Sequence, residues 1–547
     1  MLKDLFRVKS LEQLRANAEE PAHQLKRSLG RFDLTMFGIG AIIGAGIFSS
    51  IGTAAAGNLA DGRAPAGPAL VISILLVALA CGFTALAYAE LASMIPVSGS
   101  AYTYSYATMG ELMAWIIGWD LLLEYAVSNV AVAISWGDYA RSFLDNVLGI
   151  HVPGWLAVDP RSALKLADGV PVMTLADKLT ALAQAKIGVL DGAATFANWN
   201  ALKDAPLLGG FPVTINLLAI VITVLITWLV YVGIRESARA NGIMVVVKVG
   251  ILLLVIGIGA AFVSKSNWNP FAPAGWKGIQ AGAAIIFFAF IGFDAVSTTA
   301  EECRDPGRDM PRGILYSLGI CTVIYALVAL VVTGVVRYSS LAGKADPLAY
   351  IFTTHKLTAL AGIISFGAVI ATTAALLVYQ VGQPRIFMAM SRDGLLGRWF
   401  GRIHPKHKTP ANATLLTGVI VALPAGLLSI DEVVELTNIG TLFAFILVCA
   451  GVMILRWRRP EADRRFRMPW IWLTAPLGIL FCFWLALGLP GVTWVRFLCW
   501  LAAGLVIYFL YGYRKSRLHE AGRVAASATA SEALPADGEP APPGPKA

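Results

Sequence analysis

Charged residues are scarce in this chain of 547 residues: they make up 14% of the sequence, whereas hydrophobic residues make up 57%. Soluble domains carry about 25% charged residues, so a protein that folds alone in water is excluded. The apolar excess predicts an integral membrane protein in contact with the lipid bilayer. The 15 Trp and 15 Tyr residues fit aromatic belts at the two membrane interfaces.

Cysteine and histidine are also rare, and their spacing does not match the common metal sites. No two of the 6 cysteines form a CxxC pair, and all lie within or next to apolar runs. His355, His404 and His407 fall in loops without a metal-binding spacing. We therefore expect no disulfide, no metal and no cofactor.

The basic charge of the chain does not indicate a nucleic-acid partner. The formal net charge is +9, and a protein with many membrane spans collects Lys and Arg in its cytoplasmic loops. Residues 1–31 are polar and basic, and no secretory signal pattern precedes the first apolar run. We interpret them as a cytoplasmic N-terminal segment.

Runs of about 20 apolar residues are long enough to cross a bilayer as helices. An even number of such runs places both termini on one side. Of the 43 Lys and Arg residues, 29 fall in segments that lie inside if the N-terminus is inside. The positive-inside rule then predicts cytoplasmic termini in a plasma membrane, the inner membrane of a bacterium. The twelve runs are about 33–56, 67–93, 105–138, 212–233, 242–264, 281–302, 312–336, 358–390, 411–429, 436–455, 470–489 and 493–513.

Two segments lie outside this pattern. Residues 141–211 form a long outer insertion with a helix-like stretch at 173–190. A capping or partner-binding role is one interpretation and a solvated insertion is the one we favour, so no obligate protein partner is inferred. The cytoplasmic tail, 514–547, is rich in Ala, Pro, Gly and Ser, which predicts disorder.

The first span contains GIGAIIGAG at 38–46, with four glycines in nine residues. A dinucleotide-binding loop needs a preceding strand and a GxGxxG spacing, and neither is present. Close helix packing through Gly40 and Gly44 is a second interpretation, yet each glycine weakens a helix by about 1 kcal/mol. The third is a broken helix, which is tolerated in mid-membrane where the freed backbone is buried or lines a cavity.

The sixth span carries a matching interruption, FFAFIGFDAVST at 287–298, with Gly292 and Asp294 inside an apolar helix. Spans one to five and six to ten then form two corresponding halves, each opening with an interrupted helix. An odd number of helices per half inverts one half relative to the other. Paired interrupted helices of this kind point to a transporter with its site at the bilayer midplane.

Five stretches are specific enough to indicate a family: FDLTMFGIGAIIGAGIF (32–48), YAELASMIPVSGSAYTYSYATMGELMAWIIGWDLLLEY (88–125), FFAFIGFDAVSTTAEECRDPGRDMP (287–311), SRDGLL (391–396) and ELTNIGTLFAF (435–445). Together they resemble the amino acid–polyamine–organocation superfamily, and within it the bacterial permeases similar to cationic amino acid transporters. The resemblance implies an all-α membrane fold of about 12 helices. This is the LeuT type, with inverted five-helix repeats and broken helices 1 and 6.

That fold divides the chain into parts. Residues 32–456 would be the transporter core, with repeats at about 32–264 and 279–456, and residues 470–513 would add two helices. The implied protein is not an enzyme but a secondary active transporter that takes up amino acids with protons by alternating access. A sodium-coupled symporter, an exchanger, and a channel or sensor on the same fold remain open. A membrane oxidoreductase is disfavoured, because no cofactor domain and no paired intramembrane histidines are present.

The resemblance also implies where a substrate binds. The amides of Ala45 and Gly46 would receive the substrate carboxylate at a half-helix N-terminus, and Gly44 would keep the approach free of side chains. The substrate ammonium would meet main-chain carbonyls at both breaks, those of Ile42, Phe288, Ala289 and Ile291. An α-amino acid satisfies both groups.

Side-chain selectivity is expected to differ from that of cationic-selective members. Ala45 and Phe290 stand where Thr and Tyr are common, so two hydroxyls are missing. Tyr379 stands at a pocket position of the eighth helix, where such members have a small residue. Its bulk predicts neutral, small to medium amino acids, and simple packing of Tyr379 in the bundle is the alternative.

Three acidic residues lie in or at the ends of spans, where a charge at the bilayer centre costs about 2.5–3.5 kcal/mol. Glu124 is expected in the pocket wall, near the amino end of a substrate. Glu90 and Asp120 are predicted to be structural partners of loop amides or basic residues.

Lys248 is the sixth residue after Gly242 and lies about 9 Å into the fifth span. One interpretation is a lysine that snorkels to the interface. The resemblance instead places it beside the unwound first helix, where sodium-dependent relatives hold an ion. We therefore expect Lys248 to gain and lose a proton during the cycle and to couple transport to protons.

Overall fold

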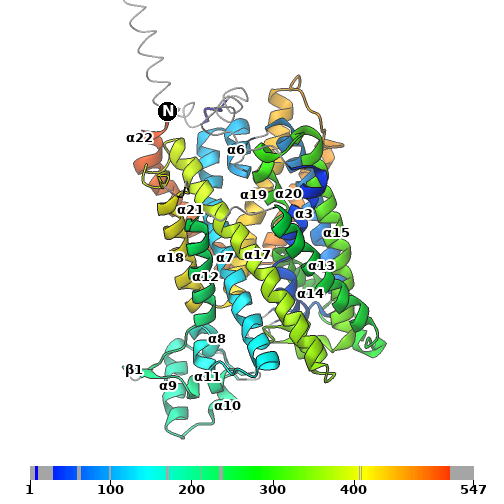
Figure 1. The fold of residues 1–547 in the computed structure, drawn as a ribbon, viewed down its shortest axis with the longest axis vertical. Coiled ribbons are helices and arrows are strands. Elements are labelled where there is room, and N and C mark those ends of the chain that lie inside the picture. Colours follow the sequence, from blue (N-terminus) through cyan, green and yellow to red (C-terminus); the bar gives the residue numbers. More distant parts are fainter. Residues whose placement is uncertain are drawn as a thin grey trace, which may run out of the picture.

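The structure, a computed structural model, describes residues 6–9, 29–57, 63–95, 97, 100–167, 170–171, 173–209, 211–232, 238–405, 407 and 409–517. It is an elongated bundle of long helices with a small helical unit at one end (Figure 1). We call the end that carries this unit the insertion end. Helices α6 and α22 lie at the opposite end, which we call the terminal end (Figure 1).

The first half of the bundle opens with an interrupted helix and continues with long ones. Its elements are α3 (Arg31–Ile42), the π-helix η1 (Gly46–Ser50), α4 (Ile51–Ala56), the 3-10 turn η3 (Gly67–Ala69), α5 (Leu70–Met94), α6 (Ser100–Thr108), α7 (Glu111–Leu148), α12 (Leu217–Val232) and α13 (Ala238–Ala260).

The rest of the bundle also starts with an interrupted helix. Its elements are α14 (Gly275–Ile286), the 3-10 helices η6 (Phe287–Phe290) and η7 (Asp294–Glu302), α15 (Pro306–Val335), α16 (Pro347–Thr353), α17 (Thr358–Arg392), α18 (Ala411–Leu427) and α19 (Ile430–Arg458), followed by α20 (Ile471–Leu487), α21 (Gly491–Ile507), the π-helix η9 (Tyr508–Gly512) and α22 (Tyr513–Lys515). Short 3-10 turns lie at Gly154–Leu156 (η4), Lys265–Trp268 (η5) and Tyr338–Leu341 (η8).

Nine of the described segments are long and apolar enough to cross a membrane, and α12, α18 and α20 are shorter apolar helices. These segments coincide with the predicted apolar runs, with one correction at the third. The run 105–138 joins two elements, because Gly110 has a φ of 104° and separates α6 from α7. The crossing helix is α7, which extends to Leu148 and so takes in the first residues of the predicted insertion.

The insertion is a small folded unit rather than an open loop. It holds α8 (Pro160–Ala163), α9 (Leu175–Lys186), α10 (Gly192–Thr195), α11 (Trp199–Lys203) and an antiparallel hairpin of β1 (Leu207–Leu208) and β2 (Phe211–Pro212). The predicted helix at 173–190 is confirmed as α9, which the Thr174 side chain caps by accepting a hydrogen bond from the Asp177 amide. A separate apolar core holds the unit together, formed by Ala163, Ala181, Leu182, Phe196 and Leu202.

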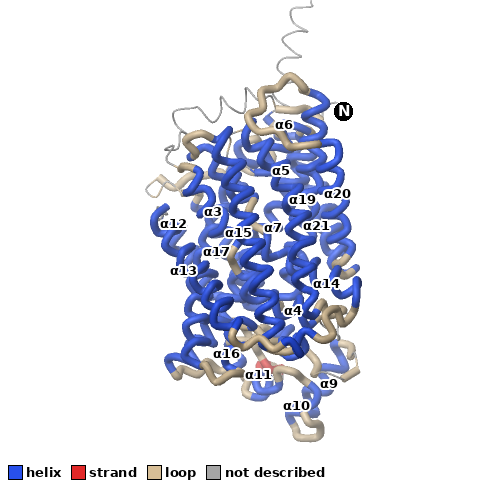
Figure 2. The backbone as a smooth tube through the Cα atoms, turned by 90° about the vertical axis from the view of Figure 1, so that its right-hand side faces the viewer, coloured by secondary structure: helices blue, strands red, loops and turns tan. Residues whose placement is uncertain are grey.

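Burial separates central from peripheral helices. In the most apolar window of the segment Arg31–Ala56, 83% of the residues are buried within the protein, and in Gly275–Ala300 the share is 89%. In Gly491–Lys515 it is 22%. Figure 2 shows the helices running roughly parallel along the bundle. The two interrupted helices are thus enclosed by protein, the environment in which irregular backbone is tolerated at membrane depth.

Candidate substrate site

The first membrane helix is interrupted in the middle of the bundle. Helix α3 ends at Ile42, Ile43 is extended (φ −74°, ψ 93°), and the chain resumes at Ala45 before the π-helix η1. A Cβ added to Gly44 would find its nearest atom, the Cβ of Ala375 in α17, at 3.4 Å. The break therefore presents a residue without a side chain where the helix opens.

The second interruption has its own requirement for glycine. After η6 ends at Phe290, Ile291 is extended (φ −63°, ψ 136°) and Gly292 has a φ of 119°. Residues with a Cβ rarely adopt that φ. A Cβ there would also lie 2.7 Å from the carbonyl oxygen of Ala41 in α3. Gly292 thus permits both the turn of the chain and the close approach of α3.

The two breaks touch through their backbones. A Cβ added to Gly46 would lie 2.3 Å from the Cα of Ala289 and 2.6 Å from its amide nitrogen. The absence of a side chain at Gly46 therefore lets η1 pack directly on η6. This packing is a reason for glycine that the sequence does not reveal, in addition to the expected bare amide.

The residues expected to bind the substrate main chain line these two breaks. Ile42, Gly44, Ala45, Gly46, Phe288, Ala289 and Ile291 are all buried. The carbonyl of Ile42 accepts a hydrogen bond of 3.0 Å from the Tyr325 hydroxyl, which leaves one lone pair for a ligand. The start of η1 leaves amides without an intrahelical partner. The arrangement can receive an anionic group and an ammonium a short distance apart.

Lys248 lies beside the first break. Its Nζ donates hydrogen bonds to the carbonyl oxygens of Gly40 (2.6 Å) and Ile43 (3.0 Å), and the side chain is fully buried. It therefore points into the bundle rather than snorkelling to an interface. The last turn of α3 has carbonyls without intrahelical partners, and the ammonium occupies two of them.

Two buried carboxyl groups, those of Asp294 and Glu124, lie near the second break. Asp294 accepts a hydrogen bond of 3.2 Å from the Gly292 amide, and the buried Glu124 of α7 lies within electrostatic range of Asp294 and Asp120. The buried ring of Tyr379 packs edge-on against Tyr125 at 5.7 Å between centroids. The phenol groups of both tyrosines lie within electrostatic range of Asp294 and Glu124, so the structure brings Glu124 and Tyr379 into one cluster.

Towards the insertion end, polar contacts cover the site. Arg63, which precedes α5, forms an ion pair with Glu435 of α19, and the Thr493 hydroxyl of α21 donates to Glu435 at 2.8 Å. Thr53 of α4 donates to Asp431 at 3.4 Å. These contacts join the segment after the first break to α19 and α21. Sequence analysis did not identify Arg63 or Tyr325 as functional, because each is an isolated residue whose partner is remote in the chain.

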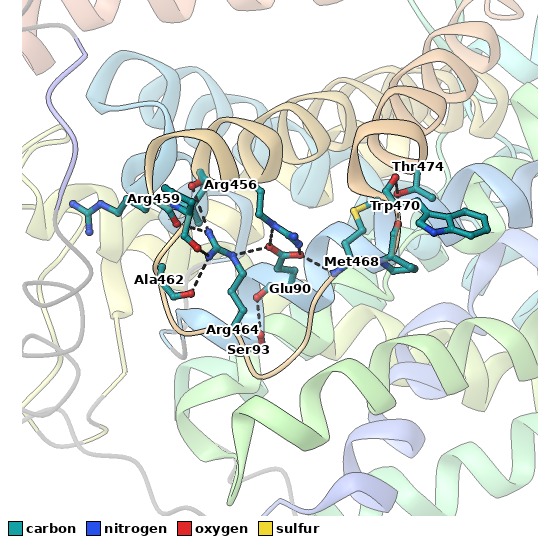
Figure 3. Close-up of polar contacts among 12 residues, drawn as sticks. Glu90, Ser93, Arg456, Arg459, Ala462, Arg464, Met468, Trp470 and Thr474 are labelled. Carbon is teal, nitrogen blue, oxygen red and sulfur yellow. Dashed lines mark hydrogen bonds and ion pairs between the residues drawn. The ribbon is translucent and has the colours of Figure 1, made fainter.

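Glu90 behaves as predicted, as a structural partner of basic residues and a loop amide. Its carboxylate accepts hydrogen bonds from Arg456 (2.5 and 3.1 Å), Arg464 (3.1 Å) and the Met468 amide (2.7 Å). Figure 3 shows these groups converging on Glu90, Arg456 from the end of α19 and Arg464 and Met468 from the segment between α19 and α20. The carboxylate therefore ties α5 to that segment.

The prediction that Asp120 is also a partner of a loop amide or a basic residue is wrong. Asp120 is fully buried, and neither carboxylate oxygen has a hydrogen-bond partner among the residues that the structure describes. It faces α19, where a Cβ added to Gly440 would lie 2.8 Å from Oδ1. No loop amide or basic side chain reaches it within the described ranges, because α7 turns this residue into the bundle.

Comparisons with known proteins agree with this geometry. The profile of the amino acid permease family matches residues 29–509. The branched-chain amino acid permease BcaP of Bacillus subtilis is 44% identical over 520 residues, 95% of this chain and all of that protein. The methylthioribose transporter of the same organism is 40% identical over 519 residues, with the same coverage. The vacuolar cationic amino acid transporter 2 of Arabidopsis thaliana is 35% identical over 468 residues, 84% of this chain and 64% of that protein.

Two interrupted helices that meet inside a multi-pass membrane bundle define a transporter, not an enzyme. The chain belongs to the amino acid permease family, and amino acid uptake is the activity that this membership indicates. The five motifs that first suggested the superfamily lie within the matched residues.

Proposed function

We propose that this permease carries neutral, branched-chain amino acids into the cell together with protons. The single observation on which the proposal rests is the contact between the two breaks, where Gly46 packs on Ala289 and brings main-chain groups of both interrupted helices together. A main-chain site of this kind recognises the carboxylate and ammonium that all α-amino acids share. The side chain of the substrate is then selected elsewhere.

The selection of a neutral, medium-sized side chain is supported by the Tyr125–Tyr379 pair. The two rings occupy the region between α7 and α17, which limits the length of a side chain. The relative named as a branched-chain amino acid permease supports the same substrate class. We expect leucine, isoleucine and valine to compete for uptake, and arginine and lysine to compete weakly.

Proton coupling is supported by the position of Lys248. Its ammonium donates hydrogen bonds to the carbonyls of Gly40 and Ile43, beside the break where the family resemblance implies that sodium-dependent relatives hold an ion. In its charged form, the Lys248 side chain links α13 to the first break. Deprotonation to the neutral amine weakens those hydrogen bonds and releases the link. Alternating access follows if the link forms and breaks once in each cycle.

The proposed architecture is a core of two inverted five-helix repeats, at about 32–264 and 279–456, within twelve membrane crossings. The matching order of broken and continuous helices in the two halves supports it. The excess of basic residues at the terminal end supports cytoplasmic termini in a plasma membrane. The insertion end would then face outward.

Uptake into proteoliposomes tests the coupling. With an acidic exterior and no sodium, wild-type protein should concentrate leucine, and Lys248→Met, the closest neutral shape, should not. A sodium gradient alone should drive no uptake. Transport driven by sodium alone, or full activity of Lys248→Met, would overturn proton coupling.

Gly44 offers the cleaner test of the site itself. Gly44→Leu should abolish binding in a folded protein, because a side chain there enters the space at the break, whereas Gly46→Leu would also separate η1 from η6. Thermal-shift assays with leucine measure this, since a ligand stabilises the state it binds. Wild-type binding by Gly44→Leu would show that the proposed site is wrong.

A second candidate substrate is methylthioribose, because one relative of 40% identity is named as its transporter. The buried carboxyls Glu124 and Asp294 could accept hydrogen bonds from ribose hydroxyls. Competition decides between the two: methylthioribose should leave leucine uptake unchanged if the main-chain site recognises amino acids.

A further inference from the structure

An apolar groove of about 520 Å³ runs along the outer surface of the bundle. It lies among α7, α17, α18, α19 and α21; α18 lines it with Leu416, Ile420 and Pro424, and Leu428 follows that helix directly. Its volume falls in the range of roughly 300–1,000 Å³ typical of ligand sites. Ile420 and Leu416 remain partly exposed, so the groove opens sideways to the bilayer.

Two tryptophans in the wall of the groove use their indole N–H groups for hydrogen bonds within the protein. Trp119 and Trp500 stack with ring centroids 4.4 Å apart, and each indole N–H donates to the backbone carbonyl of the other residue, at 2.9 and 3.2 Å. Both tryptophans line the groove. Because their donors are used internally, they offer aromatic faces to an occupant, and those faces suit a hydrocarbon.

Charged side chains lie where the groove reaches the insertion end of the bundle. Arg161 of α8 donates two hydrogen bonds of 2.7 Å to Glu432 of α19, and Arg496 of α21 donates one of 3.2 Å to the same carboxylate. Two guanidinium groups therefore share one carboxylate, which leaves a net positive charge. About half of the Arg161 side chain and 40% of the Arg496 side chain are exposed. Since each guanidinium has five donors, several remain to bind an anion.

The dimensions match one acyl chain. From Leu428 to Leu416, α18 advances by twelve residues, about 18 Å along its axis, whereas one leaflet of the hydrocarbon core is about 15 Å thick. The two exposed guanidinium groups at the end of the groove favour an anionic lipid over an apolar helix of a second copy or of another protein.

We propose that this groove binds an anionic phospholipid, with one acyl chain along α18 and the headgroup phosphate at Arg161 and Arg496. Arg161 belongs to the insertion, so the 141–211 unit completes the headgroup site. The lipid would bridge the insertion, α18 and α21. The acyl chain supplies the apolar contact that a free phosphate ion lacks.

Native mass spectrometry of the full-length protein in detergent tests the proposal. Protein incubated with phosphatidylglycerol should retain one lipid more firmly than protein incubated with phosphatidylcholine, and inorganic phosphate should not displace it. Ile420→Trp fills the groove and should lose the bound lipid. Leu423→Trp, on the lipid-facing side of the same helix, is the matched control and should keep it.

The headgroup is tested separately. Arg496→Gln should weaken phosphatidylglycerol binding about fivefold, the contribution of one basic residue near an anionic lipid surface, and should leave phosphatidylcholine unchanged. Arg465→Gln, which removes an exposed arginine paired with Asp305, is the control. Because Arg496 is on the exposed rim, this variant decides the matter even if Ile420→Trp fails to fold.

Several results would overturn the proposal. These are equal lipid retention by Ile420→Trp and Leu423→Trp, equal affinity for the two phospholipids, displacement by phosphate alone, or a co-purified protein in place of lipid. Retained phosphatidylglycerol selectivity in Arg496→Gln would overturn the assignment of the headgroup.

Discussion

Glu90 and Asp120 are both fully buried carboxyl groups in the helix bundle, yet their surroundings differ. Glu90 accepts hydrogen bonds from two arginines and an amide, so both of its oxygens are occupied. Asp120 has no hydrogen-bond partner among the described residues, and one helical turn away Glu124 lies within electrostatic range of Asp294 beside the second break. The comparison teaches that a carboxylate whose oxygens are all hydrogen-bonded holds segments together, whereas carboxyl groups with free acceptor positions gather near the candidate substrate site.

The largest expected effect comes from changing Glu90, the carboxylate whose two oxygens are both hydrogen-bonded. Glu90→Gln should lower the free energy of unfolding by about 3–5 kcal/mol, because it leaves the buried Arg464 without its charged partner. Thermal unfolding in detergent measures this. The control is Asp305→Asn, which removes an exposed pair with Arg465 and should cost about 0–1 kcal/mol. Equal loss in both variants would end the distinction between fully hydrogen-bonded and exposed pairs.

Glu435 lies between the two extremes, since it is buried and paired with Arg63 and Thr493 near the substrate site. Glu435→Gln should cost about 1.5–3 kcal/mol, the value of hydrogen bonds to a charged group. It should also speed the opening of the insertion end, seen as faster labelling of a cysteine placed at Ser50. Unchanged labelling would assign Glu435 to stability alone.

Glu124 should affect binding more than folding. Glu124→Gln is expected to weaken leucine binding about tenfold or more, because a charge-assisted hydrogen bond to the ammonium contributes about 1.5–3 kcal/mol. The unfolding temperature without ligand should stay close to that of wild type. Calorimetric titration with leucine provides the measurement, and an unchanged Kd would remove Glu124 from the pocket wall.

Asp120 should show the smallest effect on stability. Asp120→Asn loses no protein partner and replaces a carboxyl by an amide that is less costly to bury, so the change should be under about 1 kcal/mol, towards greater stability. Thermal unfolding again provides the test. A loss comparable to that of Glu90→Gln would mean that both oxygens of Asp120 are hydrogen-bonded in the functional state and that the comparison fails.

Most of the helical spans and both interruptions could be predicted from the sequence. Apolar length defines a membrane helix, and glycine clusters mark where it breaks. The junction at Gly110 was missed, because the gap between α6 and α7 is only Met109 and Gly110, which do not interrupt the apolar run. The failure at Asp120 has another cause: helical spacing puts it on the same face as Glu124, but spacing does not identify the neighbour that the face meets.

The amino-acid sequence by itself determined the membrane class, the order of spans, the two broken helices and the permease family, because these depend on local composition and on motifs within single segments. Only the tertiary structure decided which residues meet: Lys248 with the carbonyls of Gly40 and Ile43, Gly46 with the backbone of Ala289, and Glu90 with its arginines. These contacts join segments more than 200 residues apart in the chain. Their formation depends on how the helices pack, and no local pattern encodes that packing.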